Sequence, residues 1–439
     1  MVGGIIGSGI FLTTGTIASF LPTPYWILVV WTAGGLITLG AALCYGELAA
    51  ALPEAGGQYV YLRRAYGDLV GFLYGWILFL VIQTGTIAAI AAGFAEYFGY
   101  LFPAFATTRP LVRVAVGGLS HTITWGQAVA AAVTLLLSAV NYFGLRRGSW
   151  VQNLSTVAKI VALAAFVVGG FLSRAGNWSY LGAAQASPPT GLISAFGVAL
   201  ISVFWTFDGW VYVTYTAGET VAPERNVPRA LTVGVAIVTA IYLLANLVYL
   251  YAAPVSELAG VTRVAELAAT RLFGAAATSA LAALIALSCF GAMNAAILSG
   301  PRVYYAMARD GLFFRALARV HPNYYTPSLA IVAQALWAAL LALSGTFDQL
   351  LTYAMFLAIA SYGTTVAAIF VLRTKEPDLN RPYRVPAYPY LPAAYVFLTA
   401  WFVWNTLVER PRESGLGLLI LLAGLPAYWF WHGRRARRV

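Results

Sequence analysis

The chain has 439 residues, of which 61% are hydrophobic and 9% are charged, and its formal net charge is +11. Soluble domains carry about 25% charged residues, so this composition excludes an ordinary soluble protein and indicates a chain that lies in lipid. The basic residues fall in short gaps between apolar runs, which favours contact with anionic lipid over nucleic acid as the reason for the positive charge.

Twelve apolar runs are long enough to form membrane spans, since a spanning helix needs about 20 mostly apolar residues. In chain order, the predicted spans are residues 1–21, 25–52, 69–102, 126–144, 151–172, 192–217, 231–253, 272–300, 327–344, 347–372, 388–408 and 415–431. The connections are short, so we predict an all-α integral membrane protein without a soluble domain. The first run lacks the basic segment and cleavage site of a signal peptide, so it is interpreted as a retained helix that a short cytoplasmic tail could precede.

The basic residues also predict how the chain is oriented. If the N-terminus is cytoplasmic, most of the 26 Lys and Arg residues fall in cytoplasmic loops, as the positive-inside rule requires. We therefore predict a multi-pass protein of the cytoplasmic (inner) membrane with both termini on the cytoplasmic side. Residues 432–439 form the predicted basic cytoplasmic tail.

Two of the predicted spans are interrupted by polar and glycine residues at lipid depth. The first reads GGIIGSGIFLTTG, the sixth reads ISVFWTFDGWVYV, and they lie five spans apart. Broken helices at matching positions are typical of transporters built from inverted repeats. We therefore predict a first repeat over residues 1–172, a second repeat over residues 192–372, and two additional helices over residues 388–431.

The two breaks expose backbone groups of opposite polarity. A break at Gly7–Gly9 leaves unpaired amides at the start of the outer half-helix, where the helix dipole favours an anion such as a carboxylate. On the other side of that break the carbonyl of Ile5 loses its partner, and the sixth span offers free carbonyls near Trp205 and Asp208, which suit an ammonium. Together these groups match a zwitterionic α-amino acid. The alternative is that the glycines only permit close helix packing.

Ionisable residues at membrane depth are costly and are therefore functional candidates. Lys159 in the fifth span could snorkel to the cytoplasmic surface, or it could bond the carbonyls freed by the first break in place of a sodium ion. Asp208 could cap the second half of the sixth span, or it could face the substrate or carry a proton. Glu47 is expected to pair within the bundle or to reach the interface. Trp205 is expected either to pack in the core or to cover the site.

Neither a cofactor nor a metal site is predicted. The two cysteines, Cys44 and Cys289, lie in separate apolar runs without the spacing of a disulfide framework or of metal ligands. No Ser/His/Asp set or HExxH motif falls at membrane depth, which argues against an integral membrane enzyme.

The ordered motifs resemble those of the amino acid–polyamine–organocation (APC) superfamily, most closely the L-type amino acid transporter branch and its bacterial relatives. Besides the two broken spans, the resemblance rests on CYGELAAALPEAGGQYVYL, STVAKIVAL, GETVAPERNVPRAL, SCFGAMNAAILSGPRVYYAMARDG and VLRTKEPDLNRPYRVP, and it covers nearly the whole chain. It implies a LeuT-like fold with a 5+5 inverted repeat and 12 transmembrane helices, in which helices 1 and 6 are broken and two extra helices follow at the C-terminus.

The resemblance also implies roles for the residues at the breaks. The amides of Ser8 and Gly9 would bind the substrate carboxylate. The substrate ammonium would bind to the carbonyls of Ile5, Trp205 and Asp208, and the Trp205 side chain would act as an aromatic gate. Asp208 stands where several members of the branch have glycine, which places an additional charge near the site.

A further set of residues would replace the sodium ion of related transporters. Lys159 matches a lysine of the family, and it would bridge the carbonyl of Gly7 and a hydroxyl on the eighth span, for which Ser288 is the candidate. Eukaryotic members pair with a glycoprotein through a cysteine in an outer loop. No such covalent heavy-chain partner is expected here, because both cysteines lie within spans.

We therefore predict a sodium-independent transporter of small or medium neutral L-amino acids that works by alternating access, and the resemblance favours an exchanger. Proton-coupled amino acid symport, with Lys159 releasing the proton, and a cationic amino acid or polyamine carrier are the alternatives. A receptor that binds an amino acid without moving it is a different class, against which the lack of a soluble signalling domain counts. The expected partners are the amino acid substrate and the lipid bilayer, and not nucleic acid.

Overall fold

A computed structural model of the chain describes residues 1–116, 119–182, 191–344 and 347–436. Within these ranges nine helices are long and apolar enough to cross a membrane, as expected for an all-α membrane protein. Three shorter apolar helices, Gly9–Phe20, Leu192–Phe207 and Ser328–Ser344, coincide with three further predicted spans. The count of twelve spans and the LeuT-like topology stay predictions.

The helices follow the order of the apolar runs, and most of their bounds lie within a few residues of the predicted ones. The first eight are α1 (Val2–Ile5), α2 (Gly9–Phe20), α3 (Pro24–Ala51), α4 (Gln58–Tyr66), α5 (Asp68–Ile77), α6 (Gln83–Leu101), α7 (Trp125–Tyr142) and α8 (Leu145–Leu172). A π-helical turn, Leu78–Ile82, joins α5 to α6 so that they form one rod. Helix α8 begins earlier than predicted because a polar first turn precedes its apolar run.

The second part of the chain repeats the pattern of a short broken helix followed by long ones. Its helices are α9 (Leu192–Phe207), α10 (Tyr212–Tyr215), α11 (Pro223–Ala252), α12 (Val255–Leu258), α13 (Val264–Phe273), α14 (Ala275–Ser299), α15 (Pro301–Arg309), α16 (Ser328–Ser344), α17 (Phe347–Lys375), α18 (Tyr390–Glu409) and α19 (Pro411–Ala436). Short 3₁₀ turns lie at Pro103–Phe105, Trp178–Gly182, Ala217–Glu219 and Arg315–Ala318.

The segment between α6 and α7 contains a β-hairpin, which the sequence analysis treated as a connecting loop. Strand β1 (Pro110–Val116) pairs antiparallel with β2 (Leu119–Thr124). Alternating β-branched residues favour these strands, whereas the segment is too short and too polar to signal a span. Thr124 then begins α7 with a capping box, because its side chain accepts from the Gln127 amide and its own amide donates to the Gln127 side chain.

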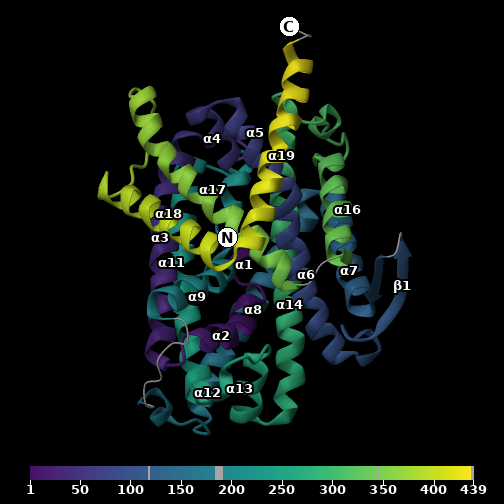
Figure 1. Ribbon diagram of the computed structural model, residues 1–439, viewed down its shortest axis with the longest axis vertical. Helices are drawn as coiled ribbons and strands as arrows, with labels where there is room; N and C mark the ends of the chain where they lie inside the picture. Colours follow the sequence, from purple (N-terminus) through teal and green to yellow (C-terminus); the bar gives the residue numbers. More distant parts are fainter. Residues whose placement is uncertain (117–118, 183–190, 345–346, 437–439) are drawn as a thin grey trace.

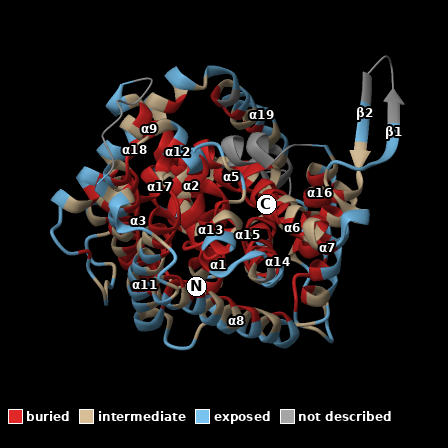
Figure 2. Ribbon diagram, turned by 90° about the horizontal axis from the view of Figure 1, so that it is seen from below, coloured by how far each residue is buried: buried red, intermediate tan, exposed pale blue. Residues whose placement is uncertain are grey.

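The two ends of the bundle differ (Figure 1). Helix α4 lies at one end together with the end of α19, and α12 and α13 lie at the other. These are called the α4 end and the α13 end below. Buried residues fill the interior when the bundle is viewed along this axis (Figure 2), where α2 packs on α9 and α1 packs on α14 and α8. Large apolar side chains such as Leu36 and Trp150 are exposed on the outer faces, as contact with lipid permits.

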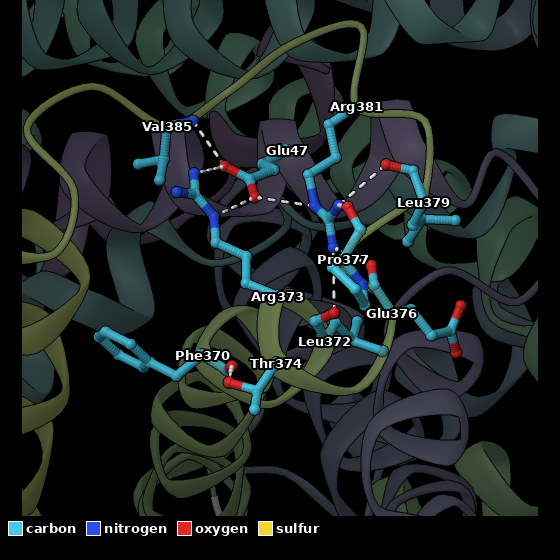
Figure 3. A network of polar contacts seen from close by, with 10 residues as sticks. All are labelled: Glu47, Phe370, Leu372, Arg373, Thr374, Glu376, Pro377, Leu379, Arg381 and Val385. Atoms are coloured by element: carbon cyan, nitrogen blue, oxygen red, sulfur yellow. Dashed lines mark hydrogen bonds and ion pairs between the residues drawn. The ribbon is translucent and has the colours of Figure 1, made fainter.

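A buried ion-pair network joins α3 to α17 at the α4 end (Figure 3). Glu47, only 2% exposed, accepts hydrogen bonds from the Arg373 guanidinium at 2.9 and 2.7 Å and from the Val385 amide at 2.7 Å. Arg381 stands 3.6 Å from the same carboxylate and donates to four carbonyls within residues 372–379. Glu47 thus pairs within the bundle, and a buried charge is tolerated when it is partnered in this way.

More exposed pairs at the α4 end attach the short helices to the bundle. Arg63 of α4 lies 2.6 Å from Asp310, whose carboxylate also accepts from the Tyr59 hydroxyl at 2.9 Å. Arg64 donates to Glu376 just after α17 at 2.6 Å, and this hydrogen bond lowers the pKa of that carboxyl. Together these contacts fix α4 against the ends of α15 and α17.

We expect Glu47→Gln to lower the thermal-unfolding midpoint of the detergent-purified protein, because it leaves two largely buried guanidinium groups without their carboxylate. Breaking a buried pair costs about 3–5 kcal/mol, whereas an exposed pair contributes about 1 kcal/mol or less. Glu376→Gln, which breaks only the exposed pair with Arg64, is the matched control and should change the midpoint little. Equal changes for the two variants in differential scanning fluorimetry would contradict a stabilising role of the network.

Candidate functional site

The first span is interrupted between α1 and α2. Helix α1 ends at Ile5, Ile6 is extended, and α2 begins at Gly9 after Ser8. The Phe11 amide donates to the Ser8 carbonyl at 3.0 Å, so the amides of Ser8 and Gly9 precede the hydrogen-bonded turns of α2. Amides at a helix N-terminus carry a partial positive charge, and this end of α2 is therefore suited to a carboxylate.

The sixth span is interrupted between α9 and α10. Asp208 follows α9 with extended dihedral angles, and its amide donates to the Trp205 carbonyl at 3.1 Å. It does not cap the second half of the span, because Val211 occupies the N-cap position of α10. Gly209 has φ +94°, and a Cβ at this position would lie 2.7 Å from the Gly4 carbonyl oxygen. Glycine therefore permits the close approach of the two breaks.

Lys159 of α8 lies against the first break and is 1% exposed. Its ammonium donates to the carbonyls of Gly3 at 2.8 Å, Ile6 at 2.6 Å and Ser288 at 3.0 Å. An ammonium has three donors, so all of them are engaged by backbone oxygens. The side chain does not snorkel to a membrane surface, because its charged end points into the bundle and is solvated there by carbonyl dipoles.

The contacts of the lysine differ from the predicted ones in two details. Lys159 contacts the carbonyl of Ile6 in place of that of Gly7, and it contacts the backbone carbonyl of Ser288 in place of the hydroxyl. The Ser288 hydroxyl lies instead within hydrogen-bonding distance of the carbonyls of Ile6 at 3.2 Å and Gly7 at 3.3 Å. Which carbonyl faces α8 depends on how the chain leaves α1, and the motif does not determine this.

Tyr242 of α11 connects the two breaks, and the sequence analysis did not single it out. Its buried hydroxyl lies 3.1 Å from the Ile5 carbonyl oxygen and 3.0 Å from the Thr206 carbonyl oxygen. Because a hydroxyl donates one hydrogen, the two broken spans share this donor. The sequence does show a tyrosine deep in an apolar span, and a buried tyrosine needs a polar partner for its hydroxyl. It does not indicate which group that partner is.

Asp208 is also engaged within the protein. Its carboxylate accepts a hydrogen bond from the Tyr362 hydroxyl of α17 at 2.6 Å, and the residue is 7% exposed. The Tyr362 ring packs against Trp210, with ring centroids 5.3 Å apart, and Trp210 packs against Tyr45 at 4.7 Å. This aromatic cluster is fully buried and joins the second break to α3 and α17.

Cavities on the two sides of the breaks are unequal. A small cavity of about 20 Å³ lies at the breaks themselves and has room for roughly one water molecule. Ligand sites typically measure about 300–1,000 Å³, so this site has to widen before it can hold an amino acid. A second cavity of about 750 Å³ lies towards the α13 end, and its wall includes Thr13 of α2 and Ser202 of α9.

Most of the predicted binding residues meet at the small cavity. Its wall includes six of them: Ile5, Gly7, Ser8, Gly9, Trp205 and Asp208. Lys159 and Ser288 lie behind the first break and hold its carbonyls from the other side. The remaining wall residues were not predicted: Gly4, Thr86, Ile90, Thr206, Tyr212 and Ala292.

Among the described residues, no cluster of His, Cys, Asp and Glu has the composition of a metal site.

Two broken helices whose N-terminal amides and C-terminal carbonyls meet inside an apolar bundle are typical of a membrane transporter. The family model for amino acid permeases matches residues 1–422, and the chain belongs to this family within the APC superfamily. The protein is therefore a multi-pass amino acid transporter and not an enzyme, which confirms both predictions.

Curated relatives match almost the whole chain. It is 32% identical to the serine/threonine exchanger SteT of Bacillus subtilis, over 99% of this chain and 95% of that protein. It is 33% identical to the large neutral amino acids transporter small subunit 2 of Homo sapiens, over 98% of this chain and 78% of that protein. It is 30% identical to the b(0,+)-type amino acid transporter 1 of Homo sapiens, over 98% of this chain and 85% of that protein.

We expect Lys159→Ala to slow amino acid uptake into vesicles at least about tenfold, because each hydrogen bond to a charged group contributes about 1.5–3 kcal/mol. The protein contains a matched control in Lys375, whose ammonium donates to the Ala65 carbonyl at the end of α17, away from the breaks. Lys375→Ala should transport normally. Full transport by Lys159→Ala at equal reconstitution would remove the lysine from the mechanism.

Tyr242→Phe is expected to reduce uptake by about fivefold, since it deletes one hydroxyl and a typical hydrogen bond contributes about 1 kcal/mol. Tyr249→Phe is the control, because Tyr249 is equally buried on the same helix and its hydroxyl has no partner among the described residues. The two variants are compared by initial uptake rates. If they behave alike, the loss does not come from the bridge between the breaks.

Proposed function

We propose that this protein exchanges small or medium neutral L-amino acids across the cytoplasmic membrane, independently of sodium and by alternating access. The proposal rests above all on the meeting of helix N-terminal amides and helix C-terminal carbonyls at two facing breaks, in a chain of the amino acid permease family. Exchange in particular is supported by the serine/threonine exchanger, which is similar to this chain along nearly its whole length.

The substrate would be held by both of its charged ends. Its carboxylate would accept from the amides of Ser8 and Gly9 at the start of α2. Its ammonium would donate to the carbonyls of Ile5, Trp205 and Asp208. All five residues border the same small cavity, which supports this assignment. The carbonyl of Ile5 accepts from the Tyr242 hydroxyl and keeps a second lone pair for the ammonium.

A neutral side chain is favoured because the two buried charges near the breaks already have partners. The Lys159 ammonium is surrounded by three carbonyls, and the Asp208 carboxylate accepts from Tyr362. A cationic or anionic side chain would need an unengaged opposite charge, since an isolated buried charge is costly. Among the remaining wall residues, the bulkier Ile90 and Tyr212 limit the room beside Thr86, Thr206 and Ala292, which favours small or medium side chains.

Sodium independence is supported by the position of Lys159. Its ammonium lies among carbonyl oxygens of α1 and α14, which are hard ligands of the kind that a small cation would take. A sodium ion at this place would have to displace the lysine. The covalently attached charge therefore replaces a bound ion and supports transport without a sodium gradient.

Alternating access is supported by the difference between the two ends. The larger cavity opens towards the α13 end, whereas ion pairs, buried at Glu47 and more exposed at Arg63, hold the α4 end together. Trp205 lies one helical turn from Ser202, so it stands between the large cavity and the small one and is suited to be the gate. We assign the α4 end and both termini to the cytoplasm, because most basic loops lie there.

The repeats and the partners complete the proposal. Residues 1–172 and 192–372 would form the inverted repeats, because each begins with a broken helix, and residues 388–431 would add two helices. Among the relatives, the large neutral amino acids transporter small subunit 2 is named as a subunit of a larger assembly. This chain would work without a disulfide-linked partner, because Cys44 and Cys289 are both buried within α3 and α14.

The purified protein can be tested in vesicles loaded with unlabelled L-serine and supplied with labelled L-serine outside. Internal L-serine should accelerate uptake well above that of empty vesicles, and replacing sodium with choline should leave the rate unchanged. Internal L-alanine and L-threonine should also accelerate uptake, whereas internal L-arginine should not. Vesicles prepared without protein serve as the control for background leakage.

Each alternative has its own signature in the same assay. A steep sodium requirement would refute the argument that the lysine replaces the ion. Uptake into empty vesicles that follows a pH gradient alone would show proton symport in place of exchange. Acceleration by internal L-arginine would show a carrier of cationic amino acids, and saturable binding without any uptake would show a receptor.

A further inference from the structure

A third cavity, of about 430 Å³, lies between α3, α9, α17 and α18. Figure 2 shows these four helices side by side in one part of the bundle. The wall residues Ala33, Thr38, Tyr362, Thr399 and Phe402 lie near the middle of their helices. The cavity is thus at mid-membrane depth, and its volume falls within the range of about 300–1,000 Å³ found for ligand sites.

The wall is mostly apolar, and three of its hydroxyl groups, those of Thr38, Thr399 and Tyr362, are engaged within the protein. Thr38 donates to the Gly34 carbonyl at 2.8 Å, and Thr399 donates to the Tyr395 carbonyl at 2.8 Å. The Tyr362 hydroxyl donates to Asp208. A ligand with polar groups would lose its hydration without finding these donors, so the cavity favours hydrocarbon.

The cavity has an outer rim and an inner wall of different exposure. On the rim, Phe397 is 73% exposed and Leu398 is 38% exposed on α18. On the inner wall, Trp210 is 3% exposed and Phe402 is 2% exposed. At this depth the surrounding medium is the hydrocarbon of the bilayer, which therefore has direct access to the rim.

We propose that this cavity binds an acyl chain of a bilayer phospholipid, inserted between α3 and α18. An open apolar cavity of this size forfeits dispersion contacts along its whole wall, and a lipid chain restores them without any desolvation of polar groups. The chain contacts the ring of Tyr362, whose hydroxyl holds Asp208 at the second break. The lipid therefore supports the aromatic wall behind the broken segment of the sixth span.

The test uses vesicles of phosphatidylcholine in which a small fraction carries a photoreactive diazirine in the middle of one acyl chain. After irradiation, the positions of the lipid adducts are mapped by mass spectrometry of peptides. Chains that only surround the protein reach exposed positions such as Phe397 or, on α8, Val161. A chain inside the cavity also reaches the buried wall, so adducts on Trp210, Thr399 and Phe402 are expected.

Ala33→Phe places a ring in the cavity and should remove the adducts on the buried wall while those on Phe397 persist. Ala165→Phe is the matched control, because Ala165 is exposed on the lipid-facing side of α8, and it should leave the map unchanged. If the unmodified protein carries adducts only at exposed positions, the proposal is wrong. This outcome can be read without any variant. The map does not depend on transport, so the proposal and the proposed function can fail separately.

Discussion

The contact between one buried ammonium and the carbonyls of the first broken span is the constraint on which the site depends. A helix that stops in the middle of an apolar bundle leaves its last carbonyls without partners, and such groups are costly at this depth. Lys159 supplies a donor to Gly3, Ile6 and Ser288 at once, so it both satisfies these carbonyls and ties α1 to α8 and α14. With a neutral side chain at this position, the chain would have to regain its helical bonds or admit water.

The groups at the breaks fall into two sets, those that hold the protein together and those that remain for a ligand. The carbonyls of the first break are mostly in the first set, because those of Gly3, Ile5, Ile6 and Gly7 accept from the side chains of Lys159, Tyr242 and Ser288. The amides at the start of α2 belong to the second set. The proposed binding site is therefore better prepared for a carboxylate than for an ammonium, because the ammonium end depends on the second lone pair of the Ile5 carbonyl and on the widening of a cavity of about 20 Å³.

Run length predicted the order of the apolar helices and most of their bounds, because a bilayer demands long apolar segments whatever their packing. The hairpin at β1 and β2 was missed because its alternation is short and lies in a connection. At the site, residues whose chemistry is unusual for their depth were found, namely the glycines of the first break, Lys159 and Asp208. Tyr242 and Tyr362 were missed because a buried tyrosine in an aromatic-rich chain does not stand out, and its partner is set by packing between distant spans.

The closure of the α4 end by ion pairs has a consequence for how that end could open. When an apolar contact separates, it exposes surface that gains nothing from water. When water reaches a buried charge, in contrast, the desolvation cost of that charge disappears. Glu47 and Arg373 attract each other strongly only while they are dry, so hydration of the opened end offsets much of the loss of their contact. In the proposed alternating-access cycle, ion pairs therefore suit a contact that is stable when closed and separates when that end opens, in a way that an apolar contact of equal strength does not.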